Sequence, residues 1–292
     1  MTPPDAATAA FEAQRPRLLR LAYRMLGSVT EAEDAVQDAW LRWRGVEAAI
    51  DTPAAYLTRI VTRLCLDRMK SARARRETYV GAWLPEPLMG STEPEEPEDD
   101  LTLTLMLALE RLSPLERAAF LLHDVFGVAL NEVAGTLGRE PAAVRQLAVR
   151  ARRHVQAARP RYAVDPGEAE RIAAAFFAAS RDGDTQALGR MLADDVVLRS
   201  DGGGRVIAFR NPIVGSARVL RLYAGLRRKH GLAPPRLLRP VWIDGLPGFV
   251  SADRGGILQT TALAIEEGRI AAIYVTRNPD KLGHVVRMLE AG

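Results

Sequence analysis

Two stretches of this sequence concentrate basic side chains, which act by binding anions rather than by transforming them. Residues 52–77 carry seven basic and two acidic side chains, and residues 139–161 carry seven basic and one acidic. Cations at that density neutralise phosphates along a nucleic-acid backbone. Between them, residues 78–100 hold seven acidic residues, four prolines and no basic residue. The pattern predicts two separate contacts with one polyanion, joined by an extended linker with little regular structure.

A glycine run, DGGGR at residues 201–205, raises a second kind of chemistry, because the backbone N–H groups of glycine-rich turns can hold a phosphate. A phosphate loop lies between a strand and the start of a helix. Here the run separates DVVLRS at 195–200 from RVIAF at 205–209, and both stretches favour strands. The context therefore predicts a tight hairpin, with Asp201 and Arg205 as a charge pair beside the turn.

Metal and membrane chemistry are not expected. The chain has one cysteine, Cys65, and no pair of Cys or His residues at ligand spacing. No stretch approaches the roughly 18 apolar residues of a membrane helix, and the first residues lack the pattern of a signal peptide. We expect a cytoplasmic protein with no metal, no cofactor and no membrane contact. Its 292 residues, 48% of them hydrophobic, suffice for two or three domains.

Helices position the first basic stretch. Apolar residues recur at helical spacing up to Gly27, which is a suitable C-cap. Thr30 with Glu33 forms a capping-box pattern for a second helix, in which an apolar stripe lies beside an acidic face. Thr52 followed by Pro53 opens a third helix that keeps its basic residues outside. Three or four helices make the first domain.

The second basic stretch follows the pattern of a helix-turn-helix. A helix with Ser113 as N-cap precedes a short helix around 132–137, a turn at 138–140 and a helix from Pro141. Apolar residues from Val144 to Val155 form the buried stripe of the last helix. Its outward donors are then suited to base edges and phosphates, whereas the plainer alternative is a solvated basic helix.

The chain changes in character after residue 163. Two helices precede the glycine turn, a third follows near 217–229, and strand patterns occur at 236–243, 248–252, 256–268 and 269–276. Helices followed by a run of antiparallel strands predict an α+β domain with one curved sheet wrapped on its helices.

The residues of the first half resemble those of an extracytoplasmic-function sigma factor. TEAEDAVQDAWLRW resembles the helix of that family that binds core RNA polymerase, TPAAYLTRIVTRLCLDRMKSARARR resembles its promoter-melting and minus-ten helix, and the helix-turn-helix resembles its minus-thirty-five reader. Residues 162–292 resemble a SnoaL-like domain, the cone-shaped fold of ketosteroid isomerases and polyketide cyclases. The implied architecture is two all-α helical domains followed by an α+β domain, at 1–77 (region 2), 78–100 (linker), 101–161 (region 4) and 162–292 (SnoaL-like).

The resemblance implies a set of binding residues in the helical domains. Core polymerase would be bound by Asp34, Gln37, Asp38 and Arg42, with Trp40 packed in the domain core. Minus-ten DNA would be bound by Tyr56, Arg59, Arg63, Arg68, Lys70 and Arg73, although Tyr56 fits a core position equally well. Minus-thirty-five DNA would be bound by Arg139, Arg145, Gln146, Arg150 and Arg153, with Arg145 and Gln146 reading bases.

Three further motifs resemble the markers of a sigma-factor subgroup with such an extension: WLPEP at 83–87, DGGGR at 201–205 and NPDKL at 278–282. An exposed Trp83 and Leu84 would leave apolar surface in water, so we expect WLPEP to dock on the C-terminal domain. The alternative is that Trp83 packs on its own helical domain. The regulatory contact would comprise Trp83, Leu84, Pro85, Asp201, Gly202, Gly203, Gly204, Arg205, Asn278, Pro279, Asp280, Lys281 and Leu282.

Two rival functions remain open. SnoaL-like cones often hold an acid or base in an apolar pocket, and an enzyme site could be imagined from Asp195, Asp201, Trp242 and Tyr274. A ligand-responsive helix-turn-helix regulator would explain the second basic helix but not the first helical domain. The expected partners are core RNA polymerase and promoter DNA, with a small ligand in the SnoaL-like pocket left open, and the free chain is expected to be monomeric.

Overall fold

The computed structural model describes residues 6–45, 50–77, 79–90, 102–156, 164–230 and 234–290. The chain divides into two compact units. The helical unit comprises Met1–Glu77 and Leu105–Ala158, and the C-terminal unit comprises Thr78–Thr104 and Arg159–Gly292. None of the helices in these ranges is long and apolar enough to cross a bilayer.

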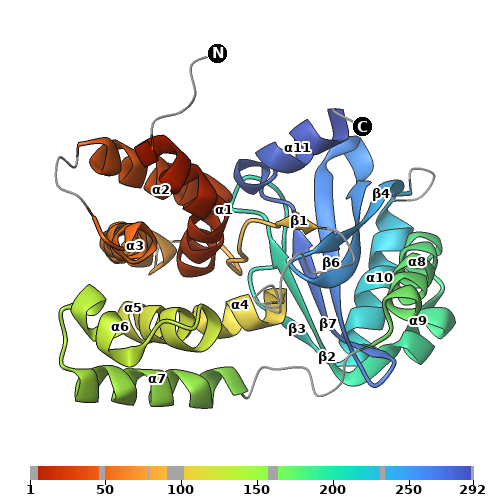
Figure 1. Cartoon of the computed structure of the whole chain (residues 1–292). Coiled ribbons are helices and arrows are strands. Elements are labelled where there is room, and N and C mark those ends of the chain that lie inside the picture. Colours follow the sequence, from red (N-terminus) through yellow and green to blue (C-terminus); the bar gives the residue numbers. More distant parts are fainter. Residues whose placement is uncertain are drawn as a thin grey trace. The chain divides into compact units, whose positions relative to one another are not determined.

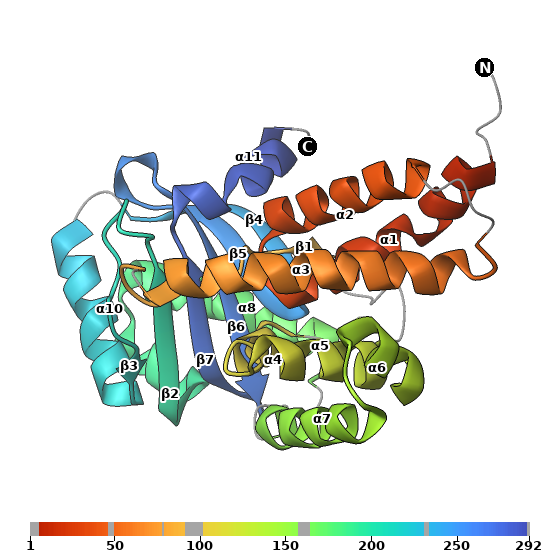
Figure 2. The ribbon, with the colours of Figure 1, turned by 90° about the vertical axis from the view of Figure 1, so that its left-hand side faces the viewer.

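The helical unit begins with three helices that run alongside one another (Figure 2): α1 (Ala6–Leu26), α2 (Val29–Arg44) and α3 (Pro53–Glu77). The apolar stripe of α2 is buried, as its spacing predicts. The predicted start of α2 is wrong. The hydroxyl of Ser28, rather than that of Thr30, accepts a hydrogen bond from the backbone N–H of Glu31 at 3.1 Å, and Thr30 lies inside the helix. Ser28 directly follows the Gly27 turn and is thus the first residue able to cap the helix.

The same unit continues with α4 (Leu103–Leu109), α5 (Pro114–Phe120), the π-helical turn η2 (Leu121–Val125), α6 (Leu130–Leu137) and α7 (Pro141–Gln156). The predicted Ser113–Glu116 capping box at the start of α5 is confirmed, with both reciprocal hydrogen bonds present. Gly138 ends α6 with a φ of 61°, a left-handed conformation that favours glycine. The turn between α6 and α7 therefore has the predicted helix-turn-helix form.

The C-terminal unit is built on one seven-stranded sheet with the order β1-β4-β5-β6-β7-β2-β3. Neighbouring strands are antiparallel except β2 and β7, which run parallel, so the sheet is mixed rather than purely antiparallel. The strands are β1 (Met89–Gly90), β2 (Leu192–Asp201), β3 (Ile213–Val214), β4 (Arg236–Ile243), β5 (Leu246–Ala252), β6 (Leu258–Glu266) and β7 (Arg269–Thr276).

Helices cover one face of this sheet (Figure 1): α8 (Pro166–Asp182), α9 (Thr185–Met191) and α10 (Ser216–His230). Alternation along β5 shows why both faces are apolar there. Phe249 packs into the core under these helices, whereas Val250 packs with Leu282 and Val285 around α11 (Gly283–Glu290). The α+β domain is as predicted, and α11 is an addition that the sequence analysis lacks.

Two expectations about this unit are corrected. Residues 205–209 form no strand, because DGGGR is followed by a turn and an unpaired loop, and β3 at Ile213–Val214 takes the place next to β2 instead. The segment 78–100 was expected to be a linker with little regular structure. Its described part, residues 79–90, belongs to the C-terminal unit, and β1 pairs with β4.

Candidate nucleic-acid interface and motif cluster

Helix α7 has the exposed donors of a recognition helix. Val144, Leu147, Ala148, Ala151 and Val155 are buried against the rest of the unit. Their burial fixes the rotation of the helix, so that Arg145, Gln146 and Arg153 are exposed, and Arg139 is exposed in the preceding turn. These four side chains can reach a nucleic acid without any change in the fold of the helix.

Two other arginines of α7 are engaged in ion pairs within the unit. The Nε of Arg150 lies 2.8 Å from the Oε1 of Glu116 on α5, although the Arg150 side chain remains 54% exposed. The Nε of Arg152 lies 2.5 Å from the Oδ1 of Asp124 in η2. Both pairs tie the recognition helix to the helices that precede it, and the exposure of Arg150 leaves its remaining guanidinium donors able to contact a phosphate.

The first turns of α3 present an aromatic and cationic group. Tyr56 is half-buried: its ring centroid lies 5.9 Å from that of Trp43, and the guanidinium of Arg59 lies 5.5 Å from the Tyr56 ring. The structure therefore gives Tyr56 an aromatic packing partner and a neighbouring exposed cation. Arg59 and Arg63 are exposed on the same helix.

Farther along α3, Arg68 links the two sets of residues that the resemblance assigns to different partners. Its Nη2 lies 2.6 Å from the Oδ2 of Asp38 on α2, its Nη1 lies 3.7 Å from the Oδ2 of Asp34, and its side chain is only 26% exposed. Lys70 pairs with Asp67 one turn away, at 2.8 Å. Arg73 has a side chain outside the described residues. Arg68 therefore braces α2 against α3.

The α2 face assigned to polymerase binding is open in this unit. Asp34, Gln37 and Arg42 are exposed, while Asp38 is held by Arg68. Trp40 is half-buried, with its ring centroid 4.9 Å from that of Phe11. It packs within the unit, as expected from the sequence.

The helices α1 to α3 and α5 to α7 pack together in one unit. The Nη1 of Arg117, which is buried, donates to the backbone oxygen of Met25 on α1 at 2.8 Å, and Arg117 also forms an ion pair with Glu110. Burial lowers the pKa of the Arg117 guanidinium to about 9. On α3 the Nε of Arg63 donates to the backbone oxygen of Thr136 in α6 at 3.4 Å. A residue assigned to minus-ten DNA therefore contacts the first helix of the helix-turn-helix.

The three motifs of the second unit meet at the carboxylate of Asp201, which is fully buried. Its oxygens accept hydrogen bonds from the hydroxyl of Tyr79 at 2.6 Å, the backbone N–H of Leu84 at 2.9 Å and the ammonium of Lys281 at 2.8 Å. They also accept one from the backbone N–H of Gly203, at 3.0 Å. One carboxylate from DGGGR thus binds both the WLPEP segment and the NPDKL turn.

Lys281 carries the charge that balances Asp201. Its ammonium also donates to the backbone oxygen of Leu84, and it lies 4.4 Å from the Trp83 ring centroid and 5.0 Å from that of Tyr79. Both rings present their faces to the ammonium, an arrangement that stabilises a desolvated cation. Burial and the neighbouring Asp201 carboxylate raise the pKa of Tyr79 well above its usual range. Trp83 therefore packs on the C-terminal unit.

The glycines of DGGGR are required by close approaches rather than by a phosphate. A Cβ at Gly203 would lie 2.3 Å from the amide nitrogen of Asn278, and the φ of Gly203 is 59°. A Cβ at Gly202 would lie 2.3 Å from the backbone oxygen of Val206. The predicted pair of Asp201 with Arg205 is wrong: Asp201 points to Lys281, and Arg205 pairs with Asp280 at 3.1 Å.

Further contacts hold the same segment and were not predicted. The backbone N–H of Leu88 donates to the Oδ2 of Asp244 at 3.2 Å, and the ring of His284 is hydrogen-bonded to the oxygen of Pro87. Tyr79 was also missed, although an aromatic residue in an acidic, proline-rich stretch is a signal of the same kind as Trp83. Asp244 has a φ of 45°, so its place in a tight turn was the available signal for it.

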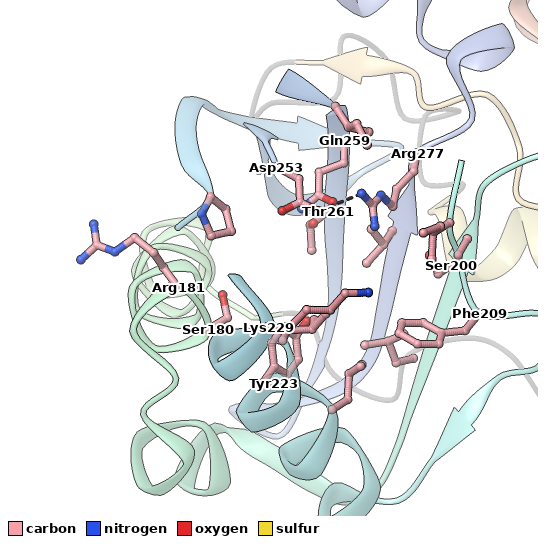
Figure 3. Close-up of a pocket in the computed structure, with 18 of the residues that line it drawn as sticks. Ser180, Arg181, Ser200, Phe209, Tyr223, Lys229, Asp253, Gln259, Thr261 and Arg277 are labelled. Atoms are coloured by element: carbon pink, nitrogen blue, oxygen red, sulfur yellow. Dashed lines mark hydrogen bonds and ion pairs between the residues drawn. The ribbon is translucent and has the colours of Figure 1, made fainter. Parts of the chain in front are cut away.

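The C-terminal unit also contains a cavity of about 680 Å³ between α8, α10 and the sheet (Figure 3). The enzyme site imagined from Asp195, Asp201, Trp242 and Tyr274 is not formed, because none of the four lines this cavity. Asp201 is used by the motif cluster, Trp242 donates to Glu170, and Tyr274 is bonded to Thr104. Among the described residues, no group of three or more His, Cys, Asp or Glu side chains is placed to hold a metal ion.

Comparison with known proteins identifies two sigma-factor regions in the helical part of the chain. Residues 10–75 match the family Sigma-70 region 2, and residues 102–155 match Sigma-70, region 4. The ECF RNA polymerase sigma factor SigJ of Mycobacterium tuberculosis is 38% identical over 93% of this chain and 91% of SigJ. The probable ECF RNA polymerase sigma factor SigI of that species is 33% identical over 97% of both chains. A crystal structure of M. tuberculosis SigJ matches with a TM-score of 0.76 at 34% identity, over 94% of this chain and 98% of that chain.

Proposed function

Because this chain belongs to the extracytoplasmic-function sigma factors, which direct RNA polymerase to promoters and start transcription, we propose that its C-terminal unit controls when both parts of a promoter can be reached. The chain binds core polymerase and promoter DNA as a sigma factor. Helices α1–α3 and helices α5–α7 divide those tasks between them, and the C-terminal unit limits how far apart the two sets of helices can move.

Polymerase binding is assigned to the exposed face of α2, through Asp34, Gln37 and Arg42. Asp38 contributes from the edge of that face, where Arg68 orients its carboxylate at 2.6 Å. Arg68 is accordingly a positioning residue in this proposal rather than a DNA contact. The finer assignment of each side chain is tested by polymerase pull-down with Gln37→Ala, and with Arg44→Ala as a control on the same helix.

DNA binding is assigned to two sets of cations. Tyr56, Arg59, Arg63, Lys70 and Arg73 of α3 would hold the melted strand at the minus-ten element, with the ring of Tyr56 as a stacking surface for a base if Arg59 moves off it. Arg145 and Gln146 would read bases at the minus-thirty-five element, while Arg139, Arg150 and Arg153 would contact phosphates.

Geometry requires the helical unit to open for this task. Elements centred about 25 base pairs apart lie roughly 85 Å apart on B-DNA. In the free chain, Arg63 on the minus-ten helix donates to Thr136 in α6 at 3.4 Å, so the two DNA-binding parts are in contact. Polymerase and promoter must therefore separate α1–α3 from α5–α7. Fluorescence energy transfer between dyes on α3 and α7 should decrease when core polymerase is added.

The docked segment limits that separation. Residues 78–104 would span about 90 Å if fully extended, which is enough for the promoter distance. When Tyr79–Gly90 and Leu103–Thr104 are held on the C-terminal unit, the helical parts attach to points no farther apart than the diameter of that unit, about 40 Å. The observation that carries this proposal is the buried ion pair of Asp201 and Lys281, which holds the backbone of Leu84. The N–H of Leu84 donates to Asp201, and its backbone oxygen accepts from Lys281.

Run-off transcription tests both levels of the proposal. Core polymerase with the full chain should initiate on members of a random promoter library above the level of core polymerase alone, and no initiation would contradict the assignment of the partners. Lys281→Met removes the ammonium that holds Leu84 and should raise initiation, whereas Arg287→Met on exposed α11 should leave it unchanged. Equal activity of all three chains would refute control by docking and leave the sigma activity intact.

A further inference from the structure

The cavity of the C-terminal unit has the size of a binding site for a small organic molecule. Its volume is about 680 Å³, within the range of roughly 300 to 1,000 Å³ typical of such sites. It lies under the helices α8 and α10, and the strands β2, β5, β6 and β7 form its other wall. Of the three motifs, only Arg205 of DGGGR lines this space.

Aromatic side chains contribute to the apolar part of the cavity wall. Phe176 and Phe249 belong to the buried core, and the ring of Tyr223 meets that of Phe176 edge to face, with centroids 5.6 Å apart. Phe209 comes from the loop after DGGGR and faces the cavity from the other side (Figure 3). Such a wall favours a flat or branched apolar molecule over a sugar or nucleotide.

One end of the cavity is polar and contains an ion pair. Arg277 lies there, with its Nη2 2.7 Å from the Oδ2 of Asp253. The Nε of Arg277 is buried and has no hydrogen-bond partner among the described residues. Gln259, Thr261 and Ser200 line the same end. A buried N–H without a partner costs stability, and an acceptor on a bound molecule would relieve that cost.

The residues that line the cavity include more basic than acidic side chains, which also favours a negatively charged molecule. Six basic residues line it and one acidic residue, Asp253, does so. Not all six are open to a bound molecule, because Arg181 points away and pairs with Asp182 (Figure 3), and Arg205 pairs with Asp280. Lys229 on α10 points toward the space beside Arg277, from the opposite wall. A bound molecule would meet cations from both walls.

We propose that this cavity binds an amphipathic organic anion, with an aromatic or branched apolar body among the phenylalanines and a carboxylate at Arg277. The Nε of Arg277 has almost no accessible surface in the free chain, so the carboxylate accepts from it after the Arg277 side chain shifts, and it then lies within the field of Lys229. Charge-assisted hydrogen bonds of this kind are about twice as strong as neutral ones, and they set the preference for an anion over an alcohol of the same shape.

The position of the cavity connects it to the motif cluster. Ser200 lines the cavity and Asp201 binds Leu84, while Arg277 lines it and Asn278 bonds to Tyr79. The backbone N–H of Arg277 donates to the backbone oxygen of Asp201 at 2.7 Å. A molecule that shifts Arg277 would therefore act on the residues that hold the docked segment. This second step rests on the proposed control by docking, whereas the binding itself does not.

The test uses the full chain and a matched pair of fluorescent probes, 1-pyrenebutyrate and 1-pyrenebutanol, which share their apolar body and differ in charge. Binding is followed by fluorescence anisotropy. The anion should bind at least about tenfold more tightly than the alcohol. Arg277→Gln should remove most of that preference without weakening the alcohol, and Lys229→Gln, an exposed position that does not endanger folding, should reduce it by a smaller factor.

Arg190→Gln is the matched control, because Arg190 is exposed on α9 and does not line the cavity. This substitution should leave both affinities unchanged. The proposal is overturned if the alcohol binds as tightly as the anion, if neither probe binds, or if Lys229→Gln and Arg190→Gln have equal effects. Hydrogen exchange at the Leu88 N–H, with and without pyrenebutyrate, measures the connection to the docked segment separately. Unchanged exchange with bound pyrenebutyrate would refute the connection and leave the binding site standing.

Discussion

Leu84→Ala should release the docked segment while leaving the fold of both units intact. The side chain of Leu84 is fully buried, whereas its main-chain N–H and oxygen bond to Asp201 and Lys281 and would survive the substitution. Truncating a buried leucine to alanine costs about 2–5 kcal/mol. Because the residue lies in the segment rather than in the sheet, the cost falls mainly on docking. A loss of about 3 kcal/mol lowers the ratio of docked to released chain about 150-fold.

Hydrogen exchange reports that ratio at a distance from the substitution. The N–H of Leu88 donates to Asp244 at 3.2 Å, and Met89–Gly90 pairs with β4, so the Leu88 N–H and the N–H of this strand that faces β4 exchange slowly only while the segment is docked. Mass spectrometry of the peptide that covers residues 85–90 should show a protection lower by up to about 150-fold. Leu88→Ala is the matched control, since that side chain is 43% exposed and its loss should change protection by about twofold at most.

The reasoning is refuted if protection at residues 88–90 stays at the wild-type value while the melting temperature of the whole chain falls. Leu84 would then be an ordinary core residue of the C-terminal unit, and its segment would have no separate released state. A fall in protection without a fall in the melting temperature of the helical unit supports the two-state segment. In that case the same variant should raise initiation in the transcription assay, as Lys281→Met does.

Three other measurements test the helical unit. Arg145→Ala or Gln146→Ala should change preference at defined upstream base pairs by about 1–3 kcal/mol, whereas Arg153→Ala should weaken all promoters alike and reduce the salt slope of binding by about one; uniform losses would show that the helix is rotated from its proposed orientation on DNA. Burial raises the pKa of the Cys65 thiol to about 12, so the thiol should resist Ellman's reagent at pH 8 until the chain unfolds. The stability that Cys65 contributes should persist below pH 9 and decline between pH 9 and 12, because the thiol ionises first in the unfolded chain. The Cys65→Ala variant should lack this decline. Arg117→Met should lower the free energy of unfolding in urea by about 3–5 kcal/mol, because it removes the buried guanidinium that pairs with Glu110 and donates to the backbone oxygen of Met25. Arg63→Met at an exposed position should cost under about 1 kcal/mol.

Local signals in the sequence predicted the elements well where one residue type decides a local conformation. Ser113 with Glu116 specifies an N-cap by its own side chains, and Gly138 permits the positive φ that ends α6. Strands β4 and β7 agree with the predicted ranges because Pro, Gly and Asp turns bound their apolar runs. The start of α2 was misplaced by two residues because Thr30–Glu33 and Ser28–Glu31 offer the same spacing, and only the position of the Gly27 turn decides between them.

Long-range pairing could not be predicted in the same way. Asp201 has two cations at hand in the motifs, Arg205 and Lys281, and proximity in sequence favours the wrong one. The parallel pairing of β2 with β7 decides the matter, because it places Asp201 opposite Thr276 and so brings the NPDKL turn to the carboxylate. Residues 205–209 alternate like a strand, yet the chain folds back tightly here. A Cβ at Gly202 would lie 2.3 Å from the backbone oxygen of Val206, and Ile207 is left exposed to solvent. These outcomes depend on which strands become neighbours.

The contacts of the free chain also indicate the order in which its parts respond. Between α1–α3 and α5–α7, the buried Arg117 donates to the backbone oxygen of Met25 at 2.8 Å, while Arg63 and Arg17 donate to main-chain oxygens in partly exposed positions, at 3.4 and 3.1 Å. Hydrogen bonds of that kind contribute about 0.5–1.5 kcal/mol each, so the binding of polymerase can replace them at modest cost. The Asp201 cluster, by contrast, is buried, and breaking its ion pair alone costs about 3–5 kcal/mol. Docking of the segment is therefore a larger barrier to the separated state than these exposed contacts, and a variant that weakens it should increase transcription more than one that weakens the contact of Arg63.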